Sequence, residues 1–219
     1  MACFETPVAL SPLGRQRLRP CAMMFIDFHT HHVPAAKDVV AVVAGRDTWG
    51  VHPWHADKDF GKPNLSGKIA IGECGLDYTR EVSKERQLKL LTTHVKLSET
   101  TGLPLIIHCV KALDQLLQLR RELRPTVPWM LHGFRGKPQQ LRSLLDAGFY
   151  VSFGFRYNEE SLRLCPTERL MLETDDDETH TISEIYNNVS NLRGVNLPNL
   201  CEAMAENYLS FFQKEPFQT

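Results

Sequence analysis

The chain has 219 residues, of which 42% are hydrophobic, and a formal net charge of −1 at pH 7. This length supports one sizeable hydrophobic core and is short for two domains. The near-neutral charge excludes a protein that binds nucleic acid through an overall positive charge, although a local basic rim around a site stays compatible with it. The apolar runs are far shorter than a membrane-spanning helix needs, so we expect no membrane partner.

Residues 1–22 differ in composition from the rest of the chain. They contain three prolines and the alternating Arg15, Arg17 and Arg19, without the apolar stretch of a secretory signal. We therefore predict a disordered or non-native N-terminal extension over residues 1–22 and a single barrel domain over residues 23–219. The scattered cysteines lack paired spacing, which favours free thiols in a reducing compartment and hence a cytoplasmic protein.

From Met24 onward, short apolar runs alternate with helix-like segments, a pattern typical of parallel α/β proteins. Helices are predicted over residues 84–101, 111–123, 138–147, from Thr181 onward, and 198–212. Candidate strands, in the number that closes a parallel barrel, cover residues 24–29, 38–43, 49–53, 68–73, 103–108, 127–132, 148–153 and 169–174.

The segment after the first strand is too short for a regular barrel. Only about 20 residues separate His31 from Val51, too few for two full helix-plus-strand units. We therefore predict an α/β protein with a TIM-type (β/α) barrel, shortened in its first two β/α units. Because the sheet face on this helix-poor flank would lack cover, we hypothesise that it forms a homodimer interface.

Residue types that bind metal ions end several of the predicted strands. His29 and His31 lie on the same side of the first strand, because side chains alternate with period two. The carboxyl ends of parallel barrel strands meet on one face, where active sites form. Six protein ligands exceed what one catalytic ion takes, so we expect two divalent ions, of zinc, manganese or magnesium. The candidate ligands are His29, His31, Glu73, His108, His132 and Asp175.

Other polar residues lie close to these strand ends. Lys111, Arg135 and Lys137 follow ligand-bearing strands and are candidate phosphate contacts, with a solvated basic rim as the alternative. His52 ends a predicted strand, where it either faces a substrate or belongs to a packed turn. Asp27 is expected to orient a ligand imidazole.

Six short motifs occur in order along residues 25–175. They are Phe-Ile-Asp-Phe-His-Thr-His, Gly-Val-His-Pro-Trp, Ala-Ile-Gly-Glu-Cys-Gly-Leu-Asp-Tyr, Leu-Pro-Leu-Ile-Ile-His, Leu-His-Gly-Phe-Arg-Gly and Leu-Glu-Thr-Asp. With them the chain resembles the TatD-like deoxyribonucleases of the metal-dependent amidohydrolase superfamily, from residue 25 to about residue 212. Two departures stand out: the region after the first motif is shorter, and Val110 occupies a position that is commonly basic.

The resemblance implies a barrel enzyme that hydrolyses phosphate esters, typically DNA, with two metal ions. It implies one ion held by His29, His31 and Asp175, a second held by His108 and His132, and Glu73 between them. A water held between two such ions loses a proton near neutral pH and attacks phosphorus. Asp175 would act as general base or orient that water, which makes Asp175 and Glu73 the predicted catalytic residues.

The function predicted from the sequence is hydrolysis of phosphodiester bonds, as in a TatD-like deoxyribonuclease. The neutral net charge and the lack of an obvious aromatic stacking platform favour a grip on few nucleotides, and hence an exonuclease. Two alternatives stay open: an amide or ester hydrolase acting on a small substrate, and a catalytically silent barrel that only binds. A carbamylated lysine at a strand end would favour the first, and loss of ligands the second; the sequence has neither feature.

Overall fold

The computed structural model describes residues 23–216, so the predicted extension over residues 1–22 lies outside the described residues and the division at residue 22 stays a prediction. The strands are β1 (Phe25–Thr30), β2 (Val39–Val43), β3 (Thr48–Trp49), β4 (Ala70–Asp77), β5 (Leu105–Val110), β6 (Trp129–Leu131), β7 (Tyr150–Phe153) and β8 (Leu170–Leu172). The helices are α1 (Lys84–Thr101), α2 (Leu113–Leu123), α3 (Pro138–Asp146), α4 (Glu159–Leu164), α5 (Ile182–Arg193) and α6 (Leu197–Phe212), with short 3₁₀ turns at Pro53–His55 and Thr167–Arg169.

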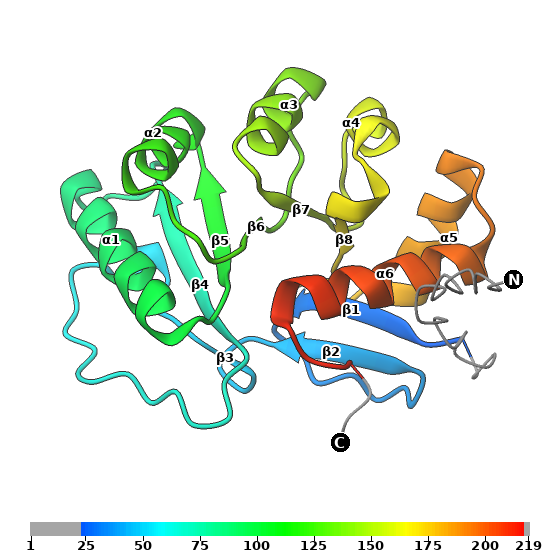
Figure 1. The fold of residues 1–219 in the computed structure, drawn as a ribbon, viewed down its shortest axis with the longest axis horizontal. Coiled ribbons are helices and arrows are strands. Elements are labelled where there is room, and N and C mark those ends of the chain that lie inside the picture. The colour runs from blue at the N-terminus through cyan, green and yellow to red at the C-terminus, as the bar shows by residue number, and fades with distance from the viewer. Residues whose placement is uncertain (1–22, 217–219) are drawn as a thin grey trace, which may run out of the picture.

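All strand pairs are parallel, and they form two sheets that meet at one point. Strands β3 to β8 pair in chain order, and β1 pairs with β2. A single bridge between Thr30 and Asp175 joins β1 to the end of β8. Within residues 23–216, β2 and β3 do not pair, so the strands form a barrel that is open between these two edges (Figure 1).

The opening coincides with the shortened part of the chain. No α-helix joins β1 to β2 or β2 to β3 in the described residues, whereas helices follow β4 to β8 and cover the outside of the sheet (Figure 1). The prediction of shortened first units is therefore confirmed. The structure adds α4, a helix of 6 residues that the sequence pattern does not predict.

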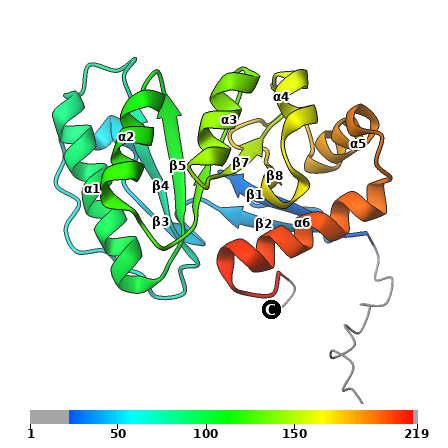
Figure 2. The same ribbon diagram turned by 45° about the horizontal axis from the view of Figure 1, so that its top comes forward.

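Strand β1 carries two candidate ligands and is held from several sides. The Tyr186 hydroxyl of α5 accepts a hydrogen bond from Ile26 N and donates one to Ile26 O, both 3.0 Å long. The Phe28 ring packs against Tyr208 and Phe212 of α6, which crosses beneath β1 and β2 (Figure 2). These contacts compensate for the missing helices around β1 and fix the position of its C-terminal end.

The helix ends follow the local chemistry of the chain. Thr181 caps α5 and forms a reciprocal capping box with Glu184, as the sequence predicts. Gly102 ends α1 in the left-handed conformation, with φ of 72°. Within residues 23–216 no helix has both the length and the apolar character needed to cross a lipid bilayer.

Candidate metal centre

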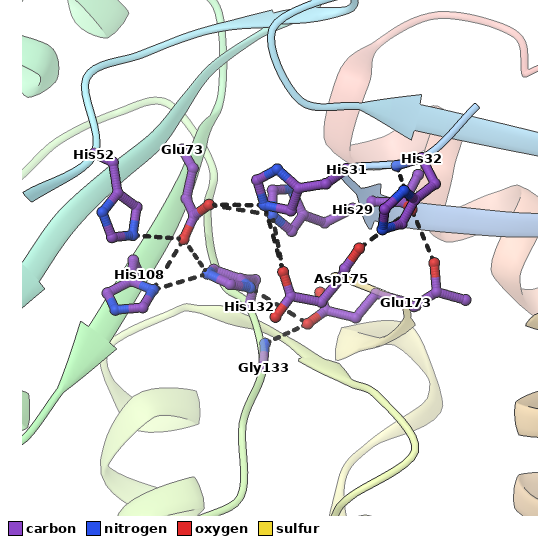
Figure 3. Close-up of polar contacts among 12 residues, drawn as sticks. His29, His31, His32, His52, Glu73, His108, His132, Gly133, Glu173 and Asp175 are labelled. Atoms are coloured by element: carbon purple, nitrogen blue, oxygen red, sulfur yellow. Dashed lines mark hydrogen bonds and ion pairs between the residues drawn. The ribbon is translucent and has the colours of Figure 1, made fainter. Parts of the chain in front are cut away.

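The backbone pairing of β1 with the end of β8 brings the first group of predicted ligands together. His31 N donates to Asp175 O at 2.9 Å, and Asp175 N donates to His29 O at 3.0 Å. His29 is fully buried on β1, and His31 follows the last residue of that strand. These two backbone hydrogen bonds thus hold both imidazoles close to the Asp175 carboxylate (Figure 3).

The donor atoms of this group surround a common point. Nε2 of His29 lies 3.5 Å from Glu73 Oε2 and 3.6 Å from Asp175 Oδ1. Nε2 of His31 lies 3.3 Å and 3.6 Å from the same two oxygens. Ligands about 2.1 Å from a tetrahedral ion are separated by about 3.4 Å, close to these spacings.

A second group of imidazoles faces the other oxygen of Glu73. Oε1 of Glu73 lies 2.9 Å from His108 Nδ1, 2.8 Å from His132 Nε2 and 3.2 Å from His52 Nε2. The nitrogens of His108 and His132 are 3.3 Å apart. Glu73 therefore directs one oxygen toward each group, as Figure 3 shows.

The donor set fits divalent cations. Both ring nitrogens of the buried His29 lack a hydrogen-bond partner within the described residues, which is costly unless another species binds there. Ligating atoms of His29, His31 and Asp175 lie close enough to share one ion, as do those of His52, Glu73 and His108. Imidazole with carboxylate is a donor combination that zinc and manganese accept readily.

Charge is concentrated at the centre. Burial alone would raise the pKa of Glu73, but the His132 imidazole and hydrogen bonds from His108 hold it well below its usual range. Burial would lower the pKa of His132, whereas Glu73 and Glu173 raise it well above the usual value. Burial and the neighbouring Glu173 raise the pKa of Asp175. A bound cation would compete with protons for these imidazole nitrogens and carboxylates.

Three residues that the predicted ligand list does not contain lie next to these groups. Glu173 is fully buried; its Oε1 accepts a 2.5 Å hydrogen bond from Gly133 N and lies 3.4 Å from His132 Nδ1. Asp77, the last residue of β4, has Oδ2 3.5 Å from His108 Nε2. His52 caps the 3₁₀ turn through Nδ1 while its Nε2 faces Glu73, so it both belongs to a packed turn and faces the centre.

Asp27 has a different role from the one expected. Its buried carboxylate accepts hydrogen bonds from Thr174 N at 3.0 Å and Thr174 Oγ1 at 2.6 Å. Among the described residues it therefore ties β1 to the segment that carries Asp175, and does not hydrogen-bond a ligand imidazole. Burial raises the pKa of Asp27 to about 7.

The three predicted phosphate contacts lie in different places. Arg135 lines a cavity that Asp175 also lines. Lys111 lines a separate groove with Tyr78 and Gln140. Lys137 is exposed at the start of α3, where its backbone N–H donates to the Gln140 side chain. Arg135 therefore shares a cavity with a predicted metal ligand.

The fold and the site define an α/β barrel protein with a histidine–carboxylate centre of the kind that binds divalent ions. The family model for TatD related DNase matches residues 22–213. The chain belongs to this family.

Relatives and solved structures agree with this assignment. The 3′-5′ ssDNA/RNA exonuclease TatD of Erwinia billingiae (strain Eb661) is 34% identical over 146 residues, 58% of this chain and 56% of the relative. The uncharacterized metal-dependent hydrolase YcfH of Escherichia coli K12 is 29% identical over 191 residues, 74% of this chain and 72% of the relative. The chain thus spans little more than half the length of the TatD exonuclease it matches.

The barrel architecture recurs in two crystal structures. YjjV, a TatD homologue from Escherichia coli K12, superposes with a TM-score of 0.69 at 20% identity, covering 82% of this chain and 79% of YjjV. A hydrolase TatD family protein from Entamoeba histolytica superposes with a TM-score of 0.66 at 23% identity, covering 79% and 74%. The predicted TIM-type barrel is confirmed by this likeness.

Proposed function

We propose that this protein is a metal-dependent hydrolase of phosphodiester bonds that uses two divalent ions. The observation that carries the proposal is the position of Glu73, whose two oxygens face two separate groups of imidazoles. We assign one ion to His29, His31 and Asp175 and the other to His108 and His132, with Glu73 bridging. Such ions, when bound, would lower the pKa of a coordinated water and stabilise charge on the phosphoryl oxygens.

The protein residues supply orientation and a proton acceptor. Asp175 is the proposed general base, because its carboxylate faces the His29 and His31 imidazoles and also lines the cavity that a substrate can enter. Glu73, with its pKa held low, stays ionised and faces one group of imidazoles with each of its oxygens. Arg135 lies in the cavity beside Asp175, where a guanidinium can neutralise a phosphate.

For the ions we favour zinc or manganese, with magnesium next. Four imidazoles in the proposed ligand set are more than magnesium usually takes, since it prefers oxygen donors and keeps several waters.

For the substrate we propose a single-stranded DNA end. The TatD relative is named for exonuclease activity on single-stranded DNA and RNA from the 3′ end. The neutral net charge favours contacts to few nucleotides, which suits cleavage at a strand end. An amide or ester hydrolase is the alternative for the same centre, and no contact in the described residues favours it. The homodimer through the helix-poor flank and the cytoplasmic location stay predictions.

The decisive experiment follows a labelled single-stranded oligonucleotide with each metal ion and with a chelator. We expect stepwise shortening from the 3′ end with manganese or zinc, and none after chelation. Elemental analysis should give two ions per native chain and fewer in Glu73→Ala. Cleavage that persists in Glu73→Ala, or in chelator, would contradict the two-metal proposal.

A further inference from the structure

A cavity of about 380 Å³ opens beside the metal centre, between the loops that follow β6, β7 and β8. We call it the side pocket; its lining includes Arg135, Phe155, Arg156, Asp175 and His180. Asp175 belongs to both the side pocket and the proposed ligand set, so a molecule at the metal centre can extend directly into the pocket. The volume is within the range of about 300–1,000 Å³ typical of small-molecule sites.

An aromatic shelf forms part of the pocket wall. The rings of Phe155 and His180 stack with centroids 3.4 Å apart and an angle of 11° between their planes. The imidazole is held in this orientation, because His180 Nδ1 lies 2.8 Å from Asp177 Oδ2 and 2.9 Å from Thr179 Oγ1. Phe155 still exposes 37% of its surface and lines the pocket with His180, so a planar group in the pocket can reach this stacked pair.

Acidic and basic side chains both line the pocket: Glu173, Asp175, Asp176, Asp177 and Glu178, together with Arg135 and Arg156. Arg135 and Arg156 are exposed, and neither forms an ion pair with any residue between 23 and 216. Asp177 is already engaged, since its Oδ1 accepts hydrogen bonds from the backbone and hydroxyl of Thr179. The pocket thus offers an aromatic face together with two uncommitted guanidinium groups, which match the base and the phosphates of a nucleotide.

Trp54, an exposed aromatic residue that packs against His52, is less available. The Arg80 guanidinium lies 3.9 Å from the centroid of the Trp54 ring, and the indole N–H donates to Asp77 Oδ2 at 2.7 Å. The guanidinium would have to be displaced before a base could use that face of the indole, and the hydrogen bond to Asp77 holds the ring in place.

We propose that the side pocket is a nucleotide subsite. A base next to the phosphodiester at the metal centre stacks on the Phe155–His180 shelf, and Arg135 and Arg156 contact the neighbouring phosphate. The proposal deepens the proposed nuclease function and rests on it for the choice of ligand. The shelf accommodates one base, in agreement with the expectation that the protein contacts few nucleotides.

The test measures binding separately from cleavage. The manganese-loaded protein is titrated into a fluorescent single-stranded oligonucleotide of about eight nucleotides, with cleavage-resistant phosphorothioate linkages at its 3′ end. We expect Phe155→Ala to weaken binding roughly 5- to 150-fold, the range for losing one base–aromatic stack. Phe155→Leu, which keeps an apolar side chain, should weaken it as well, and Phe155→Trp should retain it. Phe60→Ala is the matched control, because Phe60 is 41% exposed and lies outside the pocket.

A second set of oligonucleotides identifies the stacked base. Each of the last three nucleotides is replaced in turn by an abasic one. At one position the replacement should weaken binding to the native protein as much as Phe155→Ala does, and should not weaken binding to Phe155→Ala further. Full-strength binding by Phe155→Ala and Phe155→Leu, or equal abasic losses in both proteins at every position, would overturn the subsite.

The two proposals can fail separately. If binding depends on Phe155 but an unmodified oligonucleotide is never cleaved with any metal, the hydrolase proposal falls and the subsite stands. If cleavage occurs and binding is indifferent to Phe155, only the subsite falls.

Discussion

Asp77 Oδ2 lies 3.5 Å from Nε2 of His108, while Nδ1 of the same imidazole faces Glu73. The Trp54 indole and the Thr79 hydroxyl donate hydrogen bonds to the Asp77 carboxylate. Burial would raise the pKa of Asp77, but these hydrogen bonds outweigh burial and lower it to about 2. A carboxylate on the far side of a ligating imidazole fixes its tautomer and strengthens its basicity.

Asp77→Asn should therefore weaken metal binding about 10- to 100-fold while leaving the fold intact. The amide keeps the size of the side chain but loses the charge that faces His108. Competition with a chromogenic chelator measures the affinity, and circular dichroism checks the fold. Asp57→Asn, an exposed aspartate close to Trp54 in the chain, is the control and should bind metal like the native protein. Equal affinities for Asp77→Asn and the native protein would exclude this role.

His29→Ala should abolish hydrolysis and deplete bound metal, and His132→Ala should do the same. Each of these buried imidazoles directs a nitrogen at a Glu73 oxygen within 3.5 Å, so its removal takes away a proposed ligand. Elemental analysis and the oligonucleotide assay give the two readouts. His55→Ala provides the comparison, because His55 is exposed. A fully active, metal-replete His29→Ala protein would be incompatible with the assignment.

Much of the fold could be predicted because it depends on local patterns. Alternating apolar runs and helix caps such as Thr181–Glu184 locate the elements, and the short interval between His31 and Val51 predicts the missing helices. The end of β4 is different: the apolar run stops at Glu73, whereas the strand continues to Asp77. The register of β4 against β5 shifts between Ile71 and Cys74, and this depends on the neighbouring strand.

The residues that support the ligands could not be predicted in the same way. Glu173 acts through Gly133 and His132, which are 40 and 41 residues away in the chain. In the sequence, Glu173 is not distinguished from the other polar residues close to Asp175. Its complete burial is the signal that distinguishes it, and burial is a property of the packed barrel. The Phe155–His180 shelf likewise joins two loops and leaves no aromatic pattern in the chain.

Asp27→Asn should change the pH dependence of stability. The pKa of Asp27 is about 7 in the folded protein, against 3.8 for an ordinary aspartate, because burial disfavours the charged carboxylate. Between these values the folded state holds a proton that the unfolded state releases, so this group makes stability fall as pH rises, by about 1.4 kcal/mol per pH unit. This loss of stability is complete above the pKa of the folded state and absent below the pKa of the unfolded state.

The asparagine variant lacks this titration, so its free energy of unfolding relative to the native protein should increase between pH 5 and pH 7. Urea unfolding of the metal-free protein in chelator measures the difference at each pH. Asp38→Asn, at an exposed position just before β2, should show no such trend. A pH-independent difference for Asp27→Asn would contradict the burial argument.

Gly75→Ala should disrupt the metal centre through the backbone. Gly75 pairs with His108 across β4 and β5, has a φ of 149°, and a Cβ there would overlap the His108 carbonyl. We expect a loss of roughly 2–4 kcal/mol in unfolding free energy together with weaker metal binding, because β5 must move away with His108. Gly67→Ala separates the steric overlap from the cost of the backbone conformation. Gly67 also has a positive φ, of 72°, but a Cβ at this position would meet no atom within 4 Å. Only the backbone cost of about 1–2 kcal/mol therefore applies to Gly67→Ala. Chemical denaturation and chelator competition on both variants test this. If Gly75→Ala is no less stable than Gly67→Ala and binds metal normally, the close approach of β4 to β5 does not position His108.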